Sequence, residues 1–289
     1  ASTSPSDAQA WQRAYERMVH ELLRSGVDVQ EIARMPMPAE IRESDYVVGR
    51  QLHGGWLDLQ EVLRGILYQG GLAINPLQRL ADIQKKAMSL LHADADDSLF
   101  CLYQALADDS LGYCATHALL CAVMCELTAT KLGIDTAHRH SLVAAALTMN
   151  IGMARDQDSM ARQSSDITEW QRTLIAEHPA RGADILAGFG VDDVDQLDIV
   201  RWHHAPDHAN AYPANHAARR LLALADSFVA RTTARKTRAS QSAVKAVKAM
   251  VLKAQGDELG VGSAMAQAVG FYPPGSYVQL VTGEMAISV

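Results

Sequence analysis

The stretch CATHALLCAVMCELTATKL, residues 114–132, decides the fold class, because it is apolar on most faces of the helix that it predicts. A helix that is apolar all round has no face suited to water, so we expect it at the centre of a larger helical assembly. Helical patterns continue on both sides of it, from about Leu111 to Gln255. The stretch therefore predicts a mainly α protein built around one central helix.

The segments after this stretch carry helix start and stop signals. The sequence Thr168-Glu169-Trp170-Gln171 fits a capping box and predicts a helix that runs towards Gly188. Another helix is expected to end at Trp202-His203-His204, and a long one carries LLALADSFVA at 221–230. These signals predict an all-helical bundle between residues 111 and 255.

The two ends of the chain have a different character. At the C-terminus, YVQLV and MAISV stand on either side of Thr282-Gly283-Glu284, which predicts a short β-hairpin. Near the N-terminus, an apolar helical stripe runs from Trp11 to Leu23. Residues 46–59 show short apolar runs around a His-Gly-Gly turn, which is typical of a small β-hairpin before a helix from about Leu59.

The expected organisation is a smaller α+β N-terminal region and a larger helical domain. We place the N-terminal region at 1–95 and the helical domain with its C-terminal β-hairpin at 96–289, divided in the acidic stretch HADADDS. Nothing in the first region carries a recognisable ligand chemistry.

Composition excludes several classes of function. The 289 residues are 48% hydrophobic, enough for a buried core, and the net charge of −7 argues against non-specific binding of a nucleic acid duplex. Neither a signal peptide at the N-terminus nor an apolar run of membrane-spanning length is apparent in the sequence. We therefore expect a cytoplasmic protein without a membrane anchor.

The four cysteines lie close together in sequence, as Cys101, Cys114, Cys121 and Cys125. Together with His117 the last three could suggest a zinc site. On one continuous helix, however, Cys114 and Cys125 would lie about 16 Å apart, too far to share one tetrahedral ion. Free, buried thiols are the better interpretation.

Histidines and one aspartate form an ordered set. An aspartate inside the apolar run LLALADSFVA is costly to bury, so Asp226 is expected to face an ion, a histidine or a basic side chain. Ordinary hydrogen-bonded histidines in the core and at helix ends are the alternative. The set comprises His117, His178 before Pro179, the adjacent pair His203-His204, and Asp226.

From residue 111 to residue 289 the order of these fragments resembles the HD-GYP branch of the HD-domain phosphohydrolases. The resemblance implies an HD-domain-like helical bundle with a C-terminal hairpin. No single fragment is specific, but their order and spacing are. The matching fragments are His117, Asn150-Ile151-Gly152, HPARG at 178–182, His203-His204, Ala211-Tyr212-Pro213 and Ala225-Asp226.

The resemblance implies metal chemistry, in which histidines and aspartates hold iron or manganese ions that activate a water against cyclic di-GMP. This chain departs from the pattern at the HD pair itself. Met149 stands at the histidine, Asn150 at the bridging aspartate and Met153 at a phosphate-facing lysine. A thioether and a neutral amide are poor ligands for hard divalent ions, so the bridge between two ions should fail.

The remaining ligand positions of the family pattern could still hold one divalent ion, iron or manganese. The glutamate after the histidine pair is replaced by Ala205, and Tyr212 and Pro213 belong to a loop that reads AYP instead of GYP. The candidate metal ligands are His117, His178, His203, His204 and Asp226.

A basic segment follows, since residues 227–256 contain seven lysines and arginines and no acidic residue. Arg235 and Arg238 fall where the family has cationic contacts, and guanidinium groups suit phosphate oxygens. The resemblance, together with the departures at the HD pair, therefore favours a catalytically silent sensor of a cyclic dinucleotide, or a scaffold for a signalling protein such as a diguanylate cyclase. The alternatives are an active phosphodiesterase with a reduced metal site, and a pure interaction protein. A scaffold could use the apolar stripe from Trp11 to Leu23 to form a homodimer.

Overall fold

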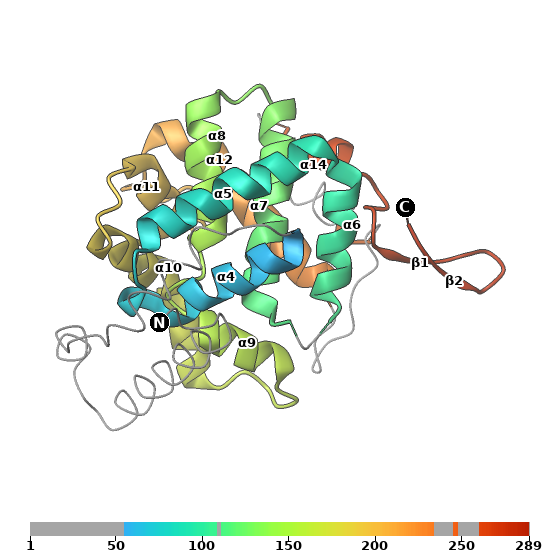
Figure 1. Cartoon of the computed structure of the whole chain (residues 1–289), viewed down its shortest axis with the longest axis horizontal. Coiled ribbons are helices and arrows are strands. Elements are labelled where there is room, and N and C mark those ends of the chain that lie inside the picture. Colours follow the sequence, from blue (N-terminus) through green and yellow to red (C-terminus); the bar gives the residue numbers. More distant parts are fainter. Residues whose placement is uncertain (1–54, 109–110, 234–244, 248–259, 289) are drawn as a thin grey trace, which may run out of the picture.

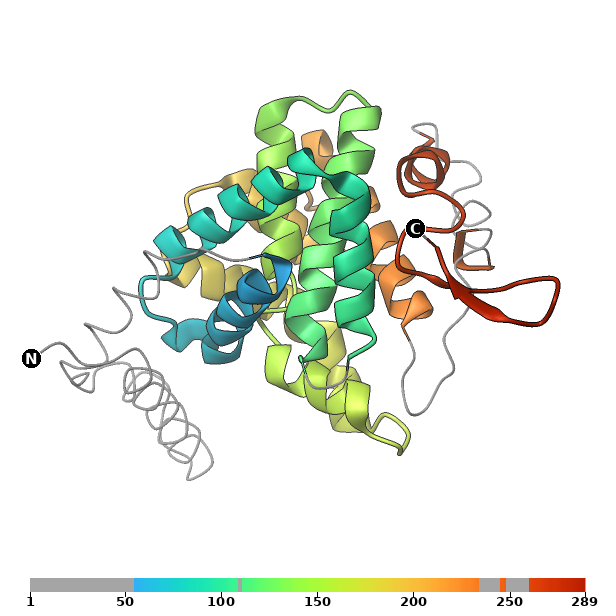
Figure 2. The same cartoon turned by 45° about the vertical axis from the view of Figure 1, so that its right-hand side comes forward.

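Helix α7, Tyr113–Lys131, lies at the centre of the computed structural model, which describes residues 55–108, 111–233, 245–247 and 260–288 (Figures 1 and 2). Fifteen of its nineteen residues are buried, which confirms the central helix predicted from 114–132. Helices α4, α6, α8, α9, α12 and α14 all contact it.

Around α7 the described chain is almost entirely helical, as expected. The other elements are, in order, α4 (Trp56–Gln69), the short 3-10 helix η1 (Gly70–Leu72), α5 (Pro76–Ala93), α6 (Ala95–Leu106), α8 (Thr136–Thr148), α9 (Ala154–Arg162), α10 (Glu169–Gly188), α11 (Val194–Trp202), the 3-10 helix η2 (Pro213–Asn215), α12 (His216–Thr232), α14 (Val261–Val269) and the strands β1 (Tyr277–Gln279) and β2 (Met285–Ile287).

Helix α7 is also long and apolar enough to span a membrane, with a mean hydropathy of 1.2 in its most apolar window. In this fold 89% of that window is buried against the other helices. Such burial is typical of the core helix of a globular protein.

Side-chain caps fix where several helices begin. The capping box predicted at Thr168 is present and starts α10, with the Thr168 hydroxyl accepting from the Gln171 amide at 3.2 Å. Asp135 and Asp193 cap α8 and α11 in the same way. The start of α7 is capped from another element, because the Asp158 carboxylate of α9 accepts from the Cys114 amide at 2.6 Å.

The C-terminal hairpin is confirmed. Strands β1 and β2 pair antiparallel, with Tyr277 opposite Ile287 and Gln279 opposite Met285. Figures 1 and 2 show that this hairpin projects away from the helices.

The hairpin expected over residues 46–59 is wrong in its last part, because Trp56 and Leu59 lie in helix α4. Trp56, Leu59, Leu63 and Ile66 follow one another at helical spacing and are buried together, so the helical period prevails over the short apolar run. Residues 46–54 and the stripe from Trp11 to Leu23 lie outside the described residues.

The division near residue 95 stays a prediction. In the described part of the chain, Leu63 and Ile83 before this point and Leu119 and Leu222 after it belong to one hydrophobic cluster.

Candidate metal centre

Three of the predicted histidines converge on one point of the fold. His178 lies in α10, and His203 and His204 follow the end of α11 directly. Each offers a ligand atom, and these three atoms all lie within 4.8 Å of one another. Since α10 and α11 pack against each other, histidines 25 positions apart in sequence come together. We call His178, His203 and His204 the three-histidine cluster.

The proline after His178 determines which nitrogen of that imidazole is free. Pro179 lies inside α10 and has no N–H, so the Ile175 carbonyl four residues earlier loses its usual helical partner. The Nδ1 atom of His178 lies 2.7 Å from this carbonyl oxygen. A carbonyl can only accept, so Nδ1 carries the proton and Nε2 keeps its lone pair.

The end of α11 orients the imidazole of His203 in the same way, through a bond between Nδ1 and a backbone carbonyl. Val200 lies in the last turn of that helix, where carbonyls lack intrahelical partners, and its oxygen lies 2.7 Å from Nδ1 of His203. The Nε2 atoms of His178 and His203 are buried and have no hydrogen-bond partner in the part of the chain that the structure describes. Two buried lone pairs directed to one cluster fit a divalent ion, because metal-bound imidazoles commonly donate their other N–H to a carbonyl.

Burial keeps these imidazoles neutral. It lowers the pKa of His178 to about 4, helped by repulsion from His204, while the bond to the Ile175 carbonyl works in the opposite direction. Burial lowers the pKa of His203 to about 3, with His204 and His178 contributing. Both rings are therefore in the neutral form that binds metal ions at neutral pH.

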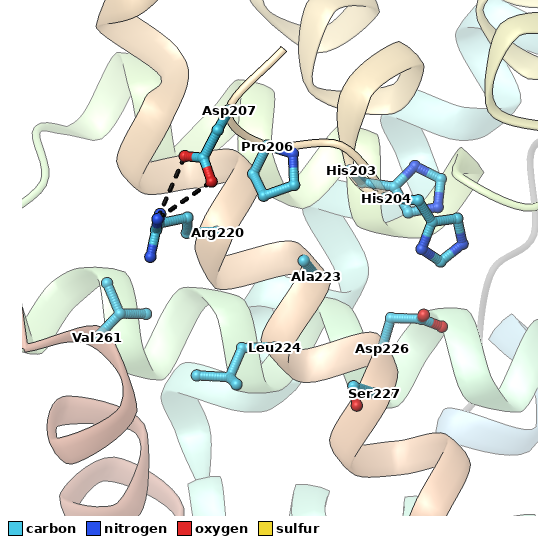
Figure 3. A pocket seen from close by; sticks show the side chains of 10 residues that line it. All are labelled: His203, His204, Pro206, Asp207, Arg220, Ala223, Leu224, Asp226, Ser227 and Val261. Atoms are coloured by element: carbon cyan, nitrogen blue, oxygen red, sulfur yellow. Dashed lines mark hydrogen bonds and ion pairs between the residues drawn. The ribbon is translucent and has the colours of Figure 1, made fainter. Parts of the chain in front are cut away.

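A pocket of about 470 Å³ opens beside the cluster (Figure 3). His203, His204 and Asp226 lie at one end of it, whereas Arg220 lies at the other, with Nη2 3.2 Å from both carboxylate oxygens of Asp207. The volume lies within the range of small-molecule sites.

The other two predicted ligands, His117 and Asp226, pair with each other. The Nε2 atom of His117 lies 2.8 Å from Oδ1 of Asp226, and its Nδ1 atom lies 2.8 Å from the Tyr113 hydroxyl. Burial alone would raise the pKa of Asp226, but the hydrogen bond and charge interaction with His117, with His204 and His203 nearby, hold it below its usual range. Asp226 is thus an anion beside the cluster.

The altered motif lies next to the cluster and is buried. Met149 belongs to the main hydrophobic core, and Met153 packs with Met160 and Leu174 in a smaller apolar cluster. Asn150 is 2% exposed, and its Nδ2 atom has no partner among the described residues.

The altered motif forms a turn at residues 149–153, and Gly152 allows this turn to lie directly against α10. A Cβ atom at Gly152 would come within 2.6 Å of the His178 carbonyl oxygen, a distance that requires a shift of the backbone. The close approach ties the position of the turn to that of His178.

A buried ion pair that sequence reasoning missed holds the loop with Tyr212 and Pro213. Arg219 and Asp198 lie 2.6 Å apart and are almost fully buried. Arg219 also donates to the carbonyls of Pro206 and Tyr212, at 2.9 and 2.7 Å, and Asp198 accepts from the Tyr212 amide at 2.9 Å. The available signal was a charged residue on the buried face of each of two helices, Asp198 in α11 and Arg219 in α12.

The loop does not need the glycine of the family pattern. Among the described non-glycine residues, a positive φ occurs at Asn75 alone, so Ala211 closes the loop in an ordinary conformation. Pro213 begins η2, and half of the Tyr212 side chain is exposed. The predicted phosphate contacts Arg235 and Arg238 lie outside the described residues.

Fold and donor set together define a helical protein with a histidine cluster that could hold a metal ion. The chain is 25% identical over 197 residues to a cyclic di-GMP phosphodiesterase of Pseudomonas aeruginosa, an alignment that covers 66% of this chain and 47% of that protein. The chain therefore spans about half the length of this curated relative. No family model and no solved structure matches the chain. The similarity agrees with the resemblance to the HD-GYP group that the sequence motifs indicate.

Proposed function

We propose that this chain is an HD-GYP-like protein that holds one divalent ion at the three-histidine cluster and binds a cyclic dinucleotide without hydrolysing it. The observation that carries the proposal is the pair of buried Nε2 atoms of His178 and His203, neither of which has a hydrogen-bond partner among the residues that the structure describes. The 470 Å³ pocket beside them and the similarity to a cyclic di-GMP phosphodiesterase support a nucleotide ligand.

Loss of hydrolysis is inferred from the donor atoms at the altered motif. The Met149 side chain is part of the hydrophobic core, and Asn150 offers a neutral amide where a carboxylate would be needed between two ions. Without that anion, no carboxylate at this position can bridge two cations and reduce their mutual repulsion. A bound ion would supply positive charge for a phosphate oxygen, and the residues of this chain would then bind the ligand without a two-ion clamp.

The ligand would lie along helix α12. Its phosphate would approach His203 and His204, and the rest of the ligand would extend over Ala223 and Leu224 towards Arg220. Arg235 and Arg238 would add phosphate contacts from the basic segment.

The direct test combines metal analysis, calorimetry with cyclic di-GMP and chromatography of the nucleotide after long incubation. We expect about one equivalent of iron, manganese or a similar ion, measurable nucleotide binding and no linear dinucleotide. The variant His178→Gln should lose the ion, because it removes one of the unpartnered lone pairs.

Turnover of cyclic di-GMP by metal-loaded protein would instead support the alternative of an active phosphodiesterase, which the name of the relative favours. Absence of both ion and nucleotide would leave a pure interaction protein.

Restoring the motif tests the inferred loss of hydrolysis. The double variant Met149→His with Asn150→Asp should take up more metal than the wild type, since it adds an imidazole and a carboxylate next to the cluster. Met149→Leu is the matched control, because it preserves the core volume and adds no ligand. Equal metal content in all three proteins would contradict the assignment of these positions.

A further inference from the structure

The C-terminal hairpin is held at its base by contacts with α6. The Gly275 carbonyl accepts from Nε2 of Gln104 at 2.8 Å. Gly275 has a φ of +83°, and a Cβ atom there would come within 2.7 Å of the Phe100 carbonyl oxygen. Helix α6 thus meets the chain directly before β1, so β2 forms the opposite edge of the projecting hairpin (Figure 2).

The outer edge of β2 has no strand beside it in the part of the chain that the structure describes. The described sheet consists of β1 and β2. The Ser288 amide donates to the Ser276 carbonyl at 2.9 Å, and bonded and non-bonded pairs alternate along an antiparallel ladder. In the register of this hairpin, the N–H and C=O groups of Met285 and Ile287 therefore point away from β1.

The hairpin lacks the residues that usually protect such an edge from other strands. Residues 276–288 contain one charged residue, Glu284, and no proline or lysine, although exposed edges commonly carry lysine or proline. A hairpin of two short strands is also only marginally stable by itself.

Exposed apolar side chains gather on and beside the same hairpin. Half of the ten large hydrophobic side chains that are exposed in the described chain lie here, namely Phe271, Tyr272, Leu280, Val281 and Ile287. An open edge and an apolar surface together favour pairing with a further strand.

We propose that this edge joins two copies of the chain, with β2 of each copy pairing antiparallel about a two-fold axis at Ala286. In this register Met285 of one copy lies opposite Ile287 of the other, so the outward N–H and C=O groups of both residues form four hydrogen bonds. The two hairpins then make one four-stranded sheet through an isologous contact. This inference is independent of the proposed function.

Charge and shape favour a second copy as the occupant of the edge. Glu284 of one copy lies opposite Ser288 of the other, and the two Glu284 residues are separated by roughly 14 Å along the strands. That separation exceeds the screening length of about 8 Å, so the register contains no like-charge contact. Each apolar tip, Leu280 and Val281, is directed towards the base of the other hairpin, where the exposed Tyr272 accepts from the Ser288 hydroxyl at 2.9 Å.

The first test is sedimentation velocity of the full chain over a range of protein concentrations, in which we expect the dimer fraction to rise with concentration. Met285→Pro removes an outward N–H that the hairpin itself does not use, and should raise the dissociation constant of the dimer by about 10- to 100-fold. Gln279→Pro is the matched control, because residue 279 lies directly opposite Met285 and its N–H points out from the β1 edge. It should leave the dimer unchanged.

The second test locates the two-fold axis. Residues at the axis face their own copies, with Cα atoms about 4.5 Å apart, so Ala286→Lys and Ala286→Glu should each place like charges in contact and give monomers. An equimolar mixture of the two variants should form a mixed dimer, because a lysine then faces a glutamate. Circular dichroism checks each fold, and the Ala286 variants decide the question if Met285→Pro does not fold.

A wild-type chain that stays monomeric at every concentration would overturn the inference and leave the edge to a strand of another protein. A dimer that persists in Met285→Pro and in both Ala286 variants would place the contact elsewhere and overturn it too. Metal content and nucleotide binding should be the same in all these variants, so neither outcome affects the proposed function.

Discussion

At the scale of single residues, burial divides the four cysteines into two kinds. Cys114, Cys121 and Cys125 are fully buried, whereas Cys101 is partly exposed. Burial, followed by the charge of Asp97, raises the pKa of Cys101 above its ordinary 9.0. A raised pKa lowers the thiolate fraction at pH 8, so this thiol should react slowly.

We therefore predict that native protein exposes one thiol to a disulfide reagent and that denatured protein exposes four. The rate for Cys101 should still increase as the pH passes 9.0, because the folded-state pKa lies above that value. Asp97→Asn removes the nearby charge and should accelerate the reaction at pH 8. A rate that levels off below pH 9 would contradict the raised pKa.

Replacing the proline beside His178 should make the protein more stable and lower its affinity for a metal ion. Pro179→Ala restores an N–H that can donate to the Ile175 carbonyl, which now accepts from His178. The free energy of unfolding should rise by about 1–3 kcal/mol, because proline is unfavourable inside a helix. Metal affinity should fall by about tenfold, since the orientation of the His178 ring loses its support.

Denaturant unfolding and a cobalt titration measure the two effects. Gly182→Ala is the control, because it also improves helix propensity in α10 but does not involve the Ile175 carbonyl. An unchanged metal affinity in Pro179→Ala would show that the proline does not orient His178.

At the scale of elements, the buried pair Asp198–Arg219 joins α11, the following loop and α12. Arg219→Met leaves a buried carboxylate without its partner and should cost about 3–5 kcal/mol of unfolding free energy. Arg201→Met breaks an exposed pair with Asp184 and should cost less than about 1 kcal/mol.

The double variant Asp198→Leu with Arg219→Met removes both charges and should recover part of the loss. Urea unfolding of the four proteins measures the difference. A cost below about 1 kcal/mol for Arg219→Met would show that the loop does not depend on this ion pair.

The contact between the altered motif and α10 gives a second prediction at this scale. Gly152→Ala places a methyl group 2.6 Å from the His178 carbonyl and should cost about 1–3 kcal/mol and weaken metal binding. Gly182→Ala meets its nearest atoms at 3.5 Å, an ordinary contact, and should be neutral or stabilising by up to about 1 kcal/mol. Thermal unfolding distinguishes the two, and equal effects would contradict the close packing at Gly152.

Sequence reasoning succeeded where the signal is local. The apolar run of α7, the capping box at Thr168 and the C-terminal hairpin each depend on residues close together in the chain. The pairs Asp198–Arg219 and His117–Asp226 join residues 21 and 109 positions apart, and no local pattern announces them. The sequence predicted which histidines are candidate ligands. It could not predict that Nε2 of His178 and of His203 lacks a hydrogen-bond partner among the described residues, whereas Nε2 of His117 has one, because this depends on the fold.

At the scale of the whole molecule, the candidate site unites distant elements. Its histidines come from α10 and the end of α11, and the nearby carboxylate comes from α12. An ion that binds only the folded protein should therefore stabilise the entire domain. At 100 times its dissociation constant the ion adds about 2.7 kcal/mol, which corresponds to a rise in melting temperature of roughly 5–10 °C.

Differential scanning fluorimetry with cobalt and with a chelator measures this rise. His178→Gln should show no rise, because it lacks a ligand of the cluster. An equal rise in that variant would place the ion elsewhere in the protein.

The projecting hairpin offers a practical advantage for such measurements. Its turn bears Val281, whose side chain is fully exposed, and the strands stand clear of the helices in Figures 1 and 2. Exposed turns of this kind tolerate insertions, because no buried backbone has to move. A peptide tag inserted between Thr282 and Gly283 should therefore immobilise the protein on a sensor chip without disturbing the helical core.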